Sequence, residues 1–267
     1  MKCIGDLKYE AAFFDVDWTL FDHASGRFVP SGIEAVKRLA KQGTKVFLCS
    51  ARNYESIRTF GLFRLGIPWS GYVSHAGGVA RVGNHYVLKQ TVDPKIIKKL
   101  CKTATDLGRN LEIVTIKSRF MISNPDEYTR DYYQVFKDPL PKVKPYRNEN
   151  CVGVLFFGPE EYDEEIKRLN PGLTYFRFAP LGMDIQVVPH IKGEGIKAIL
   201  DYVGIDKRKA IGFGDDLQDI SMASSCGTFV CMGNGKDEVK KHATFVTKRI
   251  EDDGLSYALN TLGAFSE

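Results

Sequence analysis

The hydrophobic positions of this chain alternate between short apolar runs and longer amphipathic segments. Three apolar runs in the first third predict buried strands, at 11–16, 45–49 and 71–74. The segment between the first two runs has apolar residues at helical spacing from Ile33 and stops at Gly43. Ser31 and Glu34 have the spacing of a capping box at its start. Alternating strands and helices predict a parallel sheet with right-handed crossovers.

The same alternation resumes in the last quarter of the chain. The run Lys209–Phe213 predicts another buried strand. The elements expected after it are a helix at 217–224, strands at 227–232 and 243–247, a short helix near 237–241 and a helix at 254–262 ending at Gly263. Both flanks of the chain therefore favour an α/β class with a Rossmann-like parallel sheet.

The middle of the chain has a different pattern. We expect helices at 94–107 and 160–169, strands at 111–116, 151–157, 174–178 and 183–188, and a Pro/Lys-rich connection at 137–150. This favours an α+β cap inserted at 84–187 into a core formed by 1–83 and 188–267, although one continuous large sheet domain is the alternative. A cap over the strand ends can exclude water and set specificity.

Composition narrows the class of protein. The 267 residues are 43% hydrophobic and 26% charged, with a net charge of +4, which indicates a folded chain with no concentrated basic stretch for nucleic acid. The six cysteines are scattered without a C-x-x-C pair, which is typical of free thiols in a reducing compartment. With no signal-like or membrane-length apolar run, we expect a cytoplasmic protein with no membrane partner. Its state is expected to be a monomer or a small homo-oligomer.

The candidate chemistry begins where the first apolar run ends. Asp15 and Asp17 follow it one residue apart, so both can face one site at the carboxyl edge of a parallel sheet. Carboxylates this close repel each other, and one of them needs a cation or a proton. A divalent metal meets the first need and acid/base work meets the second.

Three further segments follow in an informative order. Ser50 stands at the end of the second strand and suits a phosphate oxygen or the cap of the next helix. Lys192 opens an amphipathic helix, where it binds an anion or is simply solvated. The turn Gly214–Asp219 holds three carboxylates, of which Asp216 is expected to be a cap or surface group.

At these residues the chain resembles the haloacid dehalogenase superfamily, in its Cof-like subgroup of sugar-phosphatase-like enzymes. That family carries a large α/β cap inserted between its second and third motifs. The motif D-x-D-G-T-[LI] is matched by Asp15–Leu20, and the strand-end Ser or Thr by Ser50. The Lys-Gly motif is matched at Lys192, and G-D-x-x-N-D by Gly214–Asp219. The resemblance covers both flanks of the chain, and the middle matches only in size and pattern.

The resemblance implies a role for each matched residue. Asp15 would be the nucleophile that forms an aspartyl-phosphate, and Asp17 the general acid and base. Ser50, Lys192 and Thr19 would bind the phosphate. Mg²⁺ would be held by four residues, which are Asp15, Asp17 through its carbonyl, Asp215 and Asp219. The role of Asp219 stays open between a direct ligand, a contact through water and the orientation of Lys192.

Two positions depart from the family pattern. Trp18 stands where Gly is usual, and we expect its indole either to line the substrate entrance or to pack in the first loop. Gln218 replaces Asn and moves the amide by one methylene. Arg52 and His75 are weak candidates, because a strand-end arginine often forms a surface pair and His75 is more simply structural. Lys144, Tyr175 and Arg177 are unranked candidates for specificity.

These observations predict a Mg²⁺-dependent phosphomonoester hydrolase whose partner is a small phosphorylated metabolite, plausibly a sugar phosphate. Two alternatives stay open. A phosphotransferase or phosphomutase would use the same residues with a second alcohol as acceptor. A non-catalytic protein that binds a phosphometabolite would follow if Trp18 blocked the pocket. A metal-nucleotide glycosyltransferase fits poorly, because it leaves Lys192 without a role.

Overall fold

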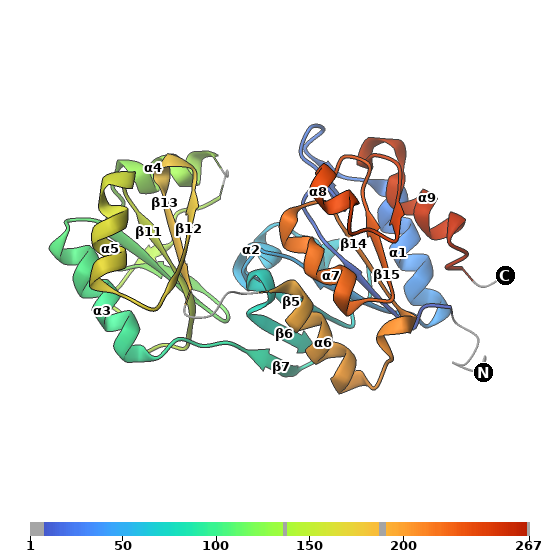
Figure 1. The fold of residues 1–267 in the computed structure, drawn as a ribbon, viewed down its shortest axis with the longest axis horizontal. Coiled ribbons are helices and arrows are strands. Elements are labelled where there is room, and N and C mark those ends of the chain that lie inside the picture. Colours follow the sequence, from blue (N-terminus) through green and yellow to red (C-terminus); the bar gives the residue numbers. More distant parts are fainter. Residues whose placement is uncertain (1–7, 136–137, 187–190, 266–267) are drawn as a thin grey trace. The chain divides into compact units, whose positions relative to one another are not determined.

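The computed structural model describes residues 8–135, 138–186 and 191–265. The chain divides into two compact units (Figure 1). The core unit consists of 1–52, 57–88 and 191–267, and the inserted unit of 53–56 and 89–190. In the described part of the chain, no helix is both long enough and apolar enough to cross a membrane.

The core unit is built on an eight-stranded sheet in the order β16-β15-β14-β1-β4-β5-β6-β7. Its strands are β1 (Ala11–Phe14), β4 (Lys45–Cys49), β5 (Gly71–Ser74), β6 (Val79–Val82), β7 (His85–Lys89), β14 (Ala210–Gly214), β15 (Thr228–Cys231) and β16 (Phe245–Val246). Neighbours from β16 to β5 pair in parallel, and β6 pairs antiparallel with β5. The expected parallel α/β core is confirmed, with an antiparallel edge that the alternation did not predict.

Helices cover both faces of this sheet (Figure 1). On one side α1 (Pro30–Gln42) packs with α9 (Gly254–Thr261), and on the other α6 (Lys192–Val203) packs with α7 (Ile220–Ser225). Ile196 and Ile199 of α6 join the core around Phe13 and Phe47, whose rings stack at 5.0 Å. Burying these apolar side chains fixes the strand ends that carry the candidate site. Further elements are α8 (Asp237–Lys240), the hairpin of β2 (Phe21–Asp22) with β3 (Arg27–Phe28), and α2 (Tyr54–Thr59), whose first three residues belong to the inserted unit.

The ends of α1 test two predictions. Gly43 terminates the helix with φ 112°, a left-handed conformation that glycine adopts without steric cost. The capping box predicted at Ser31 and Glu34 is wrong. Val29 is the N-cap residue and Pro30 takes the first helical turn, where no N–H is needed. The Ser31 hydroxyl is therefore inside the helix and donates to Asp253 instead.

The inserted unit has a six-stranded sheet in the order β10-β9-β8-β11-β13-β12. Its strands are β8 (Asn110–Thr115), β9 (Arg119–Met121), β10 (Lys142–Val143), β11 (Cys151–Phe157), β12 (Thr174–Phe178) and β13 (Gly182–Gln186), and its helices are α3 (Pro94–Asp106), α4 (Glu127–Val135) and α5 (Asp163–Leu169). The pairs are antiparallel except β9 with β10. The strands predicted at 151–157 and 174–178 are confirmed, α4 and β9 were not predicted, and the end of the strand predicted at 183–188 lies outside the described residues.

The two faces of this second sheet differ in chemistry. Side chains of α3 and α5 pack on one face in an apolar cluster that includes Ile97, Ile113 and Ile166. On the other face, cross-strand pairing puts Glu112, Leu155 and Asp184 in one row. Glu112 is fully buried and accepts a hydrogen bond from Tyr133 of α4. This face of the sheet therefore carries buried polar groups beside an apolar cluster that includes Met121, Tyr133 and Phe157.

Candidate active site

The carboxyl ends of two neighbouring core strands bring together residues that are far apart in sequence. Phe14 of β1 pairs with Phe213 of β14, so Asp15 and Asp215 follow adjacent strand ends. This is the edge where open parallel sheets place their ligands.

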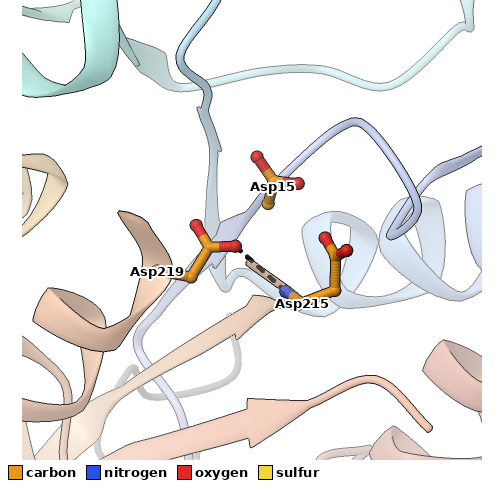
Figure 2. Close-up of side chains that lie close together, drawn as sticks. All are labelled: Asp15, Asp215 and Asp219. Atoms are coloured by element: carbon orange, nitrogen blue, oxygen red, sulfur yellow. Dashed lines mark hydrogen bonds between the residues drawn. The ribbon is translucent and has the colours of Figure 1, made fainter. Parts of the chain in front are cut away.

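Three carboxylates converge at this edge (Figure 2). Asp15, Asp215 and Asp219 are buried, and they offer oxygens that all lie within 4.8 Å of one another. Asp219 also accepts hydrogen bonds from the backbone N–H groups of Asp215 and Asp216, at 3.0 and 3.1 Å. Asp216 itself caps the short helix at Leu217–Asp219, so its expected role as a cap is confirmed.

Glycine is required at the start of this turn. A Cβ on Gly214 would lie 2.4 to 2.5 Å from side-chain atoms of Asp219, closer than real Cβ contacts allow. The absence of a side chain lets the Asp219 carboxylate fold back over the turn.

Lys192 lies among the carboxylates. Its Nζ donates to Asp15 Oδ1 and to Asp219 Oδ1, each at 2.6 Å, and the residue is 3% exposed. It is the first residue of α6, and its ammonium is buried with carboxylates on two sides. The alternative of a solvated first-turn lysine is therefore wrong, because the packing of α6 on the sheet carries the side chain into the site.

The charges in this cluster do not balance. Burial raises the pKa of Asp15 well above its usual value, and Asp219 and Asp215 add to this against the lowering effect of Lys192. Burial, with Asp219 and Asp216, raises the pKa of Asp215 to about 7. Burial opposes the charge on Lys192, but Asp15 and Asp219 outweigh it and raise the pKa of its ammonium. Three ionised carboxylates facing one ammonium would carry excess negative charge, which protons or a metal ion can offset. Their oxygens are the hard ligands that Mg²⁺ prefers.

Asp17 lies outside this group of three. Its side chain is 34% exposed and forms an ion pair with Arg52, whose Nη2 donates to Oδ1 at 2.6 Å and Nε to Oδ2 at 2.9 Å. His23 Nε2 lies 2.7 Å from the same Oδ1. Burial works to raise the pKa of Asp17, but Arg52 and then His23 outweigh it and leave the pKa lowered. The two carboxylates of the first motif therefore have opposite environments.

Trp18, which directly follows Asp17, has a left-handed backbone. Its φ is 60°, it is 39% exposed, and its carbonyl accepts a hydrogen bond from Asn234 Nδ2 at 2.9 Å. The indole ring lies 5.2 Å from the His23 ring. Glycine, usual at this position in the family that the chain resembles, would adopt this backbone without strain. The proposed role of Trp18 at the substrate entrance stays a prediction.

Ser50 and Thr19 are buried beside the strand ends. Ser50 Oγ accepts a hydrogen bond from the Arg52 N–H at 3.1 Å, while the first turn of α2 is capped by Asn53 Oδ1, which accepts from Ser56. Thr19 Oγ1 donates to Asp215 Oδ1 at 3.5 Å. Ser50 is thus not the cap of α2, and Thr19 contacts the acidic cluster directly.

Several weaker candidates have structural partners. Ser74 Oγ lies 2.9 Å from Nδ1 of buried His75, and Gln218 is exposed. In the inserted unit Arg177 pairs with Asp163 at 2.6 Å, and the Tyr175 hydroxyl donates to the Asn170 carbonyl at 2.6 Å. Lys144 pairs with Glu149. Each of these residues except Gln218 therefore has a partner within the protein, and their roles in specificity stay predictions.

Sequence reasoning missed the partners of Asp17. His23 follows the first motif in a loop whose conformation the motif does not reveal, and Arg52 was given little weight as a surface residue. The one available signal was proximity in sequence, since Arg52 follows Ser50 by two residues and His23 follows Asp17 by six.

The chain matches known proteins over most of its length. Residues 12–259 match the family model of haloacid dehalogenase-like hydrolases. The Bacillus subtilis protein named "Putative phosphatase YkrA" is 30% identical over 257 residues, covering 94% of this chain and 96% of that protein.

Solved structures show the same fold over 96% of the chain. A hypothetical protein of Geobacillus kaustophilus has a TM-score of 0.89 at 30% identity, covering 96% of this chain and all of that one. The subclass IIB sugar phosphatase BT4131 has a TM-score of 0.77 at 25% identity with equal coverage. The chain therefore belongs to the haloacid dehalogenase-like hydrolase family.

Proposed function

We propose that this protein is a Mg²⁺-dependent phosphomonoester hydrolase that acts on a small phosphorylated metabolite through an aspartyl-phosphate. The observation that carries the proposal is the buried Asp15 carboxylate, held by Lys192 within 2.6 Å and facing Asp215 and Asp219. A carboxylate oriented by a cation at a strand end is placed to act as a nucleophile. The family match supports a hydrolytic reaction.

Two transfer steps account for the reaction. In the first, an oxygen of Asp15 forms a bond to phosphorus, the bond from phosphorus to the ester oxygen breaks, and Asp17 gives a proton to the departing alcohol. In the second, Asp17 takes a proton from water, whose oxygen attacks phosphorus and releases inorganic phosphate and the Asp15 carboxylate. One group serves as acid and then as base.

The remaining site residues would bind charge. Lys192, the Ser50 hydroxyl and the Thr19 backbone would contact phosphoryl oxygens, because positioning and electrostatic stabilisation dominate phosphoryl transfer. Mg²⁺ would be held by Asp15, the Asp17 carbonyl, Asp215 and Asp219. When bound, it supplies positive charge that lets a phosphate dianion approach these carboxylates.

The inserted unit would set specificity as a cap. The sheet face that carries Glu112 also carries Asp184 and Gln186, whose Nε2 donates to Asp184 Oδ2 at 2.7 Å. Gly153 adds no side chain there, and a Cβ on it would meet only Asp184 Oδ1 and the Ile185 carbonyl, at 3.8 and 3.9 Å. Carboxylate and amide groups are suitable hydrogen-bond partners for the hydroxyls of a sugar phosphate. The name of BT4131 as a sugar phosphatase supports this class.

Phosphate release from p-nitrophenyl phosphate tests the proposal. We expect release by the wild-type protein with Mg²⁺, and loss of release with EDTA or in Asp15→Asn. Asp201→Asn, which changes an exposed carboxylate of α6, is the matched control and should keep full activity. Release that persists in Asp15→Asn would contradict the nucleophile.

Product analysis and a binding measurement separate the alternatives. A phosphotransferase or phosphomutase would yield a phosphorylated acceptor in place of inorganic phosphate when an alcohol or sugar is added. A binding protein would bind small phosphometabolites in calorimetry and release no phosphate from any of them.

A further inference from the structure

The Asp17 carboxylate is held by more donors than an ordinary loop carboxylate. Oδ1 receives Arg52 Nη2 and His23 Nε2, at 2.6 and 2.7 Å, and Oδ2 receives Arg52 Nε at 2.9 Å. The fork of a guanidinium on both oxygens fixes the plane of the carboxylate. The imidazole of His23, six residues after Asp17, adds a second contact to Oδ1.

Aromatic rings support both donors. The Arg52 guanidinium carbon lies 3.9 Å from the centroid of the Phe60 ring, a cation–π distance. The His23 ring packs edge-on against Phe21 at 4.9 Å and lies 5.2 Å from Trp18. Phe21 also packs edge-on against Phe60 at 4.6 Å, so the supports of the two donors are in contact with each other.

An isolated exposed ion pair would not have this support. Exposed pairs contribute little, because two mobile side chains must be ordered to make them. Here the ordering is achieved by ring packing. Trp18 adopts a strained left-handed backbone and still places its ring beside His23. The tryptophan that stands in place of the family's usual glycine therefore packs beside His23, which in turn contacts Asp17.

We propose that His23 and Arg52 are positioning residues that hold the Asp17 carboxylate for proton transfer, with Trp18 supporting His23. This inference rests on the proposed function, since it assigns Asp17 its acid and base steps. Oδ1 has two donors, whereas Oδ2 has one donor among the described residues.

Leaving-group dependence tests this role. A p-nitrophenolate departs without a proton, whereas the alkoxide of glycerol phosphate requires one. We expect His23→Ala to lower kcat/KM for glycerol phosphate by about tenfold, a part of the effect of a positioned acid, and to change kcat/KM for p-nitrophenyl phosphate less than threefold. His23→Gln, which keeps an N–H donor, should recover most of the loss.

Two further variants give the largest and the smallest change expected in the ratio of the two kcat/KM values. Asp17→Asn should show the largest change in the ratio of the two kcat/KM values. His242→Ala removes an exposed histidine that lies 3.9 Å from Glu238, and should leave both values unchanged. A loss of folding in His23→Ala would lower both values in parallel, and the ratio is therefore the quantity that reports positioning.

The outcomes distinguish this inference from the proposed function. An unchanged ratio in both His23→Ala and Arg52→Lys, with wild-type activity present, would overturn the positioning role alone. No phosphate release by the wild-type protein from either ester or from a panel of sugar phosphates would overturn the proposed function, and the positioning role with it.

Discussion

Replacing Lys192 with methionine tests whether one ammonium holds the acidic cluster together. Methionine keeps about the same length and apolar volume and removes the charge together with its N–H donors. Lys192 is 3% exposed and lies 2.6 Å from both Asp15 and Asp219. Removing one partner of a buried ion pair costs about 3–5 kcal/mol, because the remaining charge stays buried without compensation. We expect Lys192→Met to lower the free energy of unfolding by that amount in metal-free buffer at pH 7.5.

The loss should depend on pH in a defined direction. Lys192 lowers the pKa of Asp15, so its removal raises that pKa further. The carboxylates can then take up protons as the pH falls, and the difference between variant and wild type should shrink toward pH 5.5. Urea unfolding followed by tryptophan fluorescence and circular dichroism at both pH values measures it.

Two variants make the result specific. Lys37→Met removes a partly exposed lysine of α1 that pairs with Glu34 at 2.8 Å, and should change the free energy of unfolding by less than about 1 kcal/mol. Adding Asp219→Asn to Lys192→Met should recover part of the loss, since one buried charge is removed. Unfolding of Lys192→Met within about 1 kcal/mol of wild type at pH 7.5 would refute the reasoning.

Two more predictions follow from the other buried carboxyls. Asp215→Asn should stabilise the metal-free protein at pH 8, because ionising a group whose pKa is raised to about 7 destabilises the fold above that pH. The same variant should lose the rise in melting temperature that Mg²⁺ gives the wild type, and a retained rise would contradict Asp215 as a ligand. In the inserted unit, burial raises the pKa of Glu112 to about 7, so its stabilising contribution is present below about pH 4.5 and is lost as the pH rises through 7. Glu112→Gln should remove up to about 3 kcal/mol of that pH dependence, measured as the difference in urea unfolding between pH 5 and pH 8, and identical pH profiles would contradict it.

Local patterns in the chain predicted the core well. The apolar run at 45–49 coincides with β4, and Gly43 ends α1, because strand burial and left-handed helix ends depend on residues close in sequence. The chain's order of strand-end groups also identified Asp15, Lys192 and Asp215 as candidates. In the inserted unit, α4 and β9 were not predicted. β9 has three residues and pairs with the neighbouring strand β8, and so short a run carries little periodicity.

The motifs predicted which residues lie near the candidate site, and the structure shows how their environments differ. The first motif places Asp15 and Asp17 one residue apart and gives no reason to separate them. In the folded chain Asp15 is buried against Lys192, whereas Asp17 turns to Arg52 and His23. The opposite pKa shifts of the two groups depend on partners brought from other loops and strands.

The sequence by itself determined the fold class, because the class follows from the periodicity of apolar residues along the chain. It also determined which polar residues follow each strand, and so which residue types are available at the candidate site. Only the tertiary structure decided that Lys192 is buried between two carboxylates and that His23 reaches Asp17. The conformation of the chain between the partners decides whether such contacts form, and their energies depend on burial, which the packing of the whole core sets.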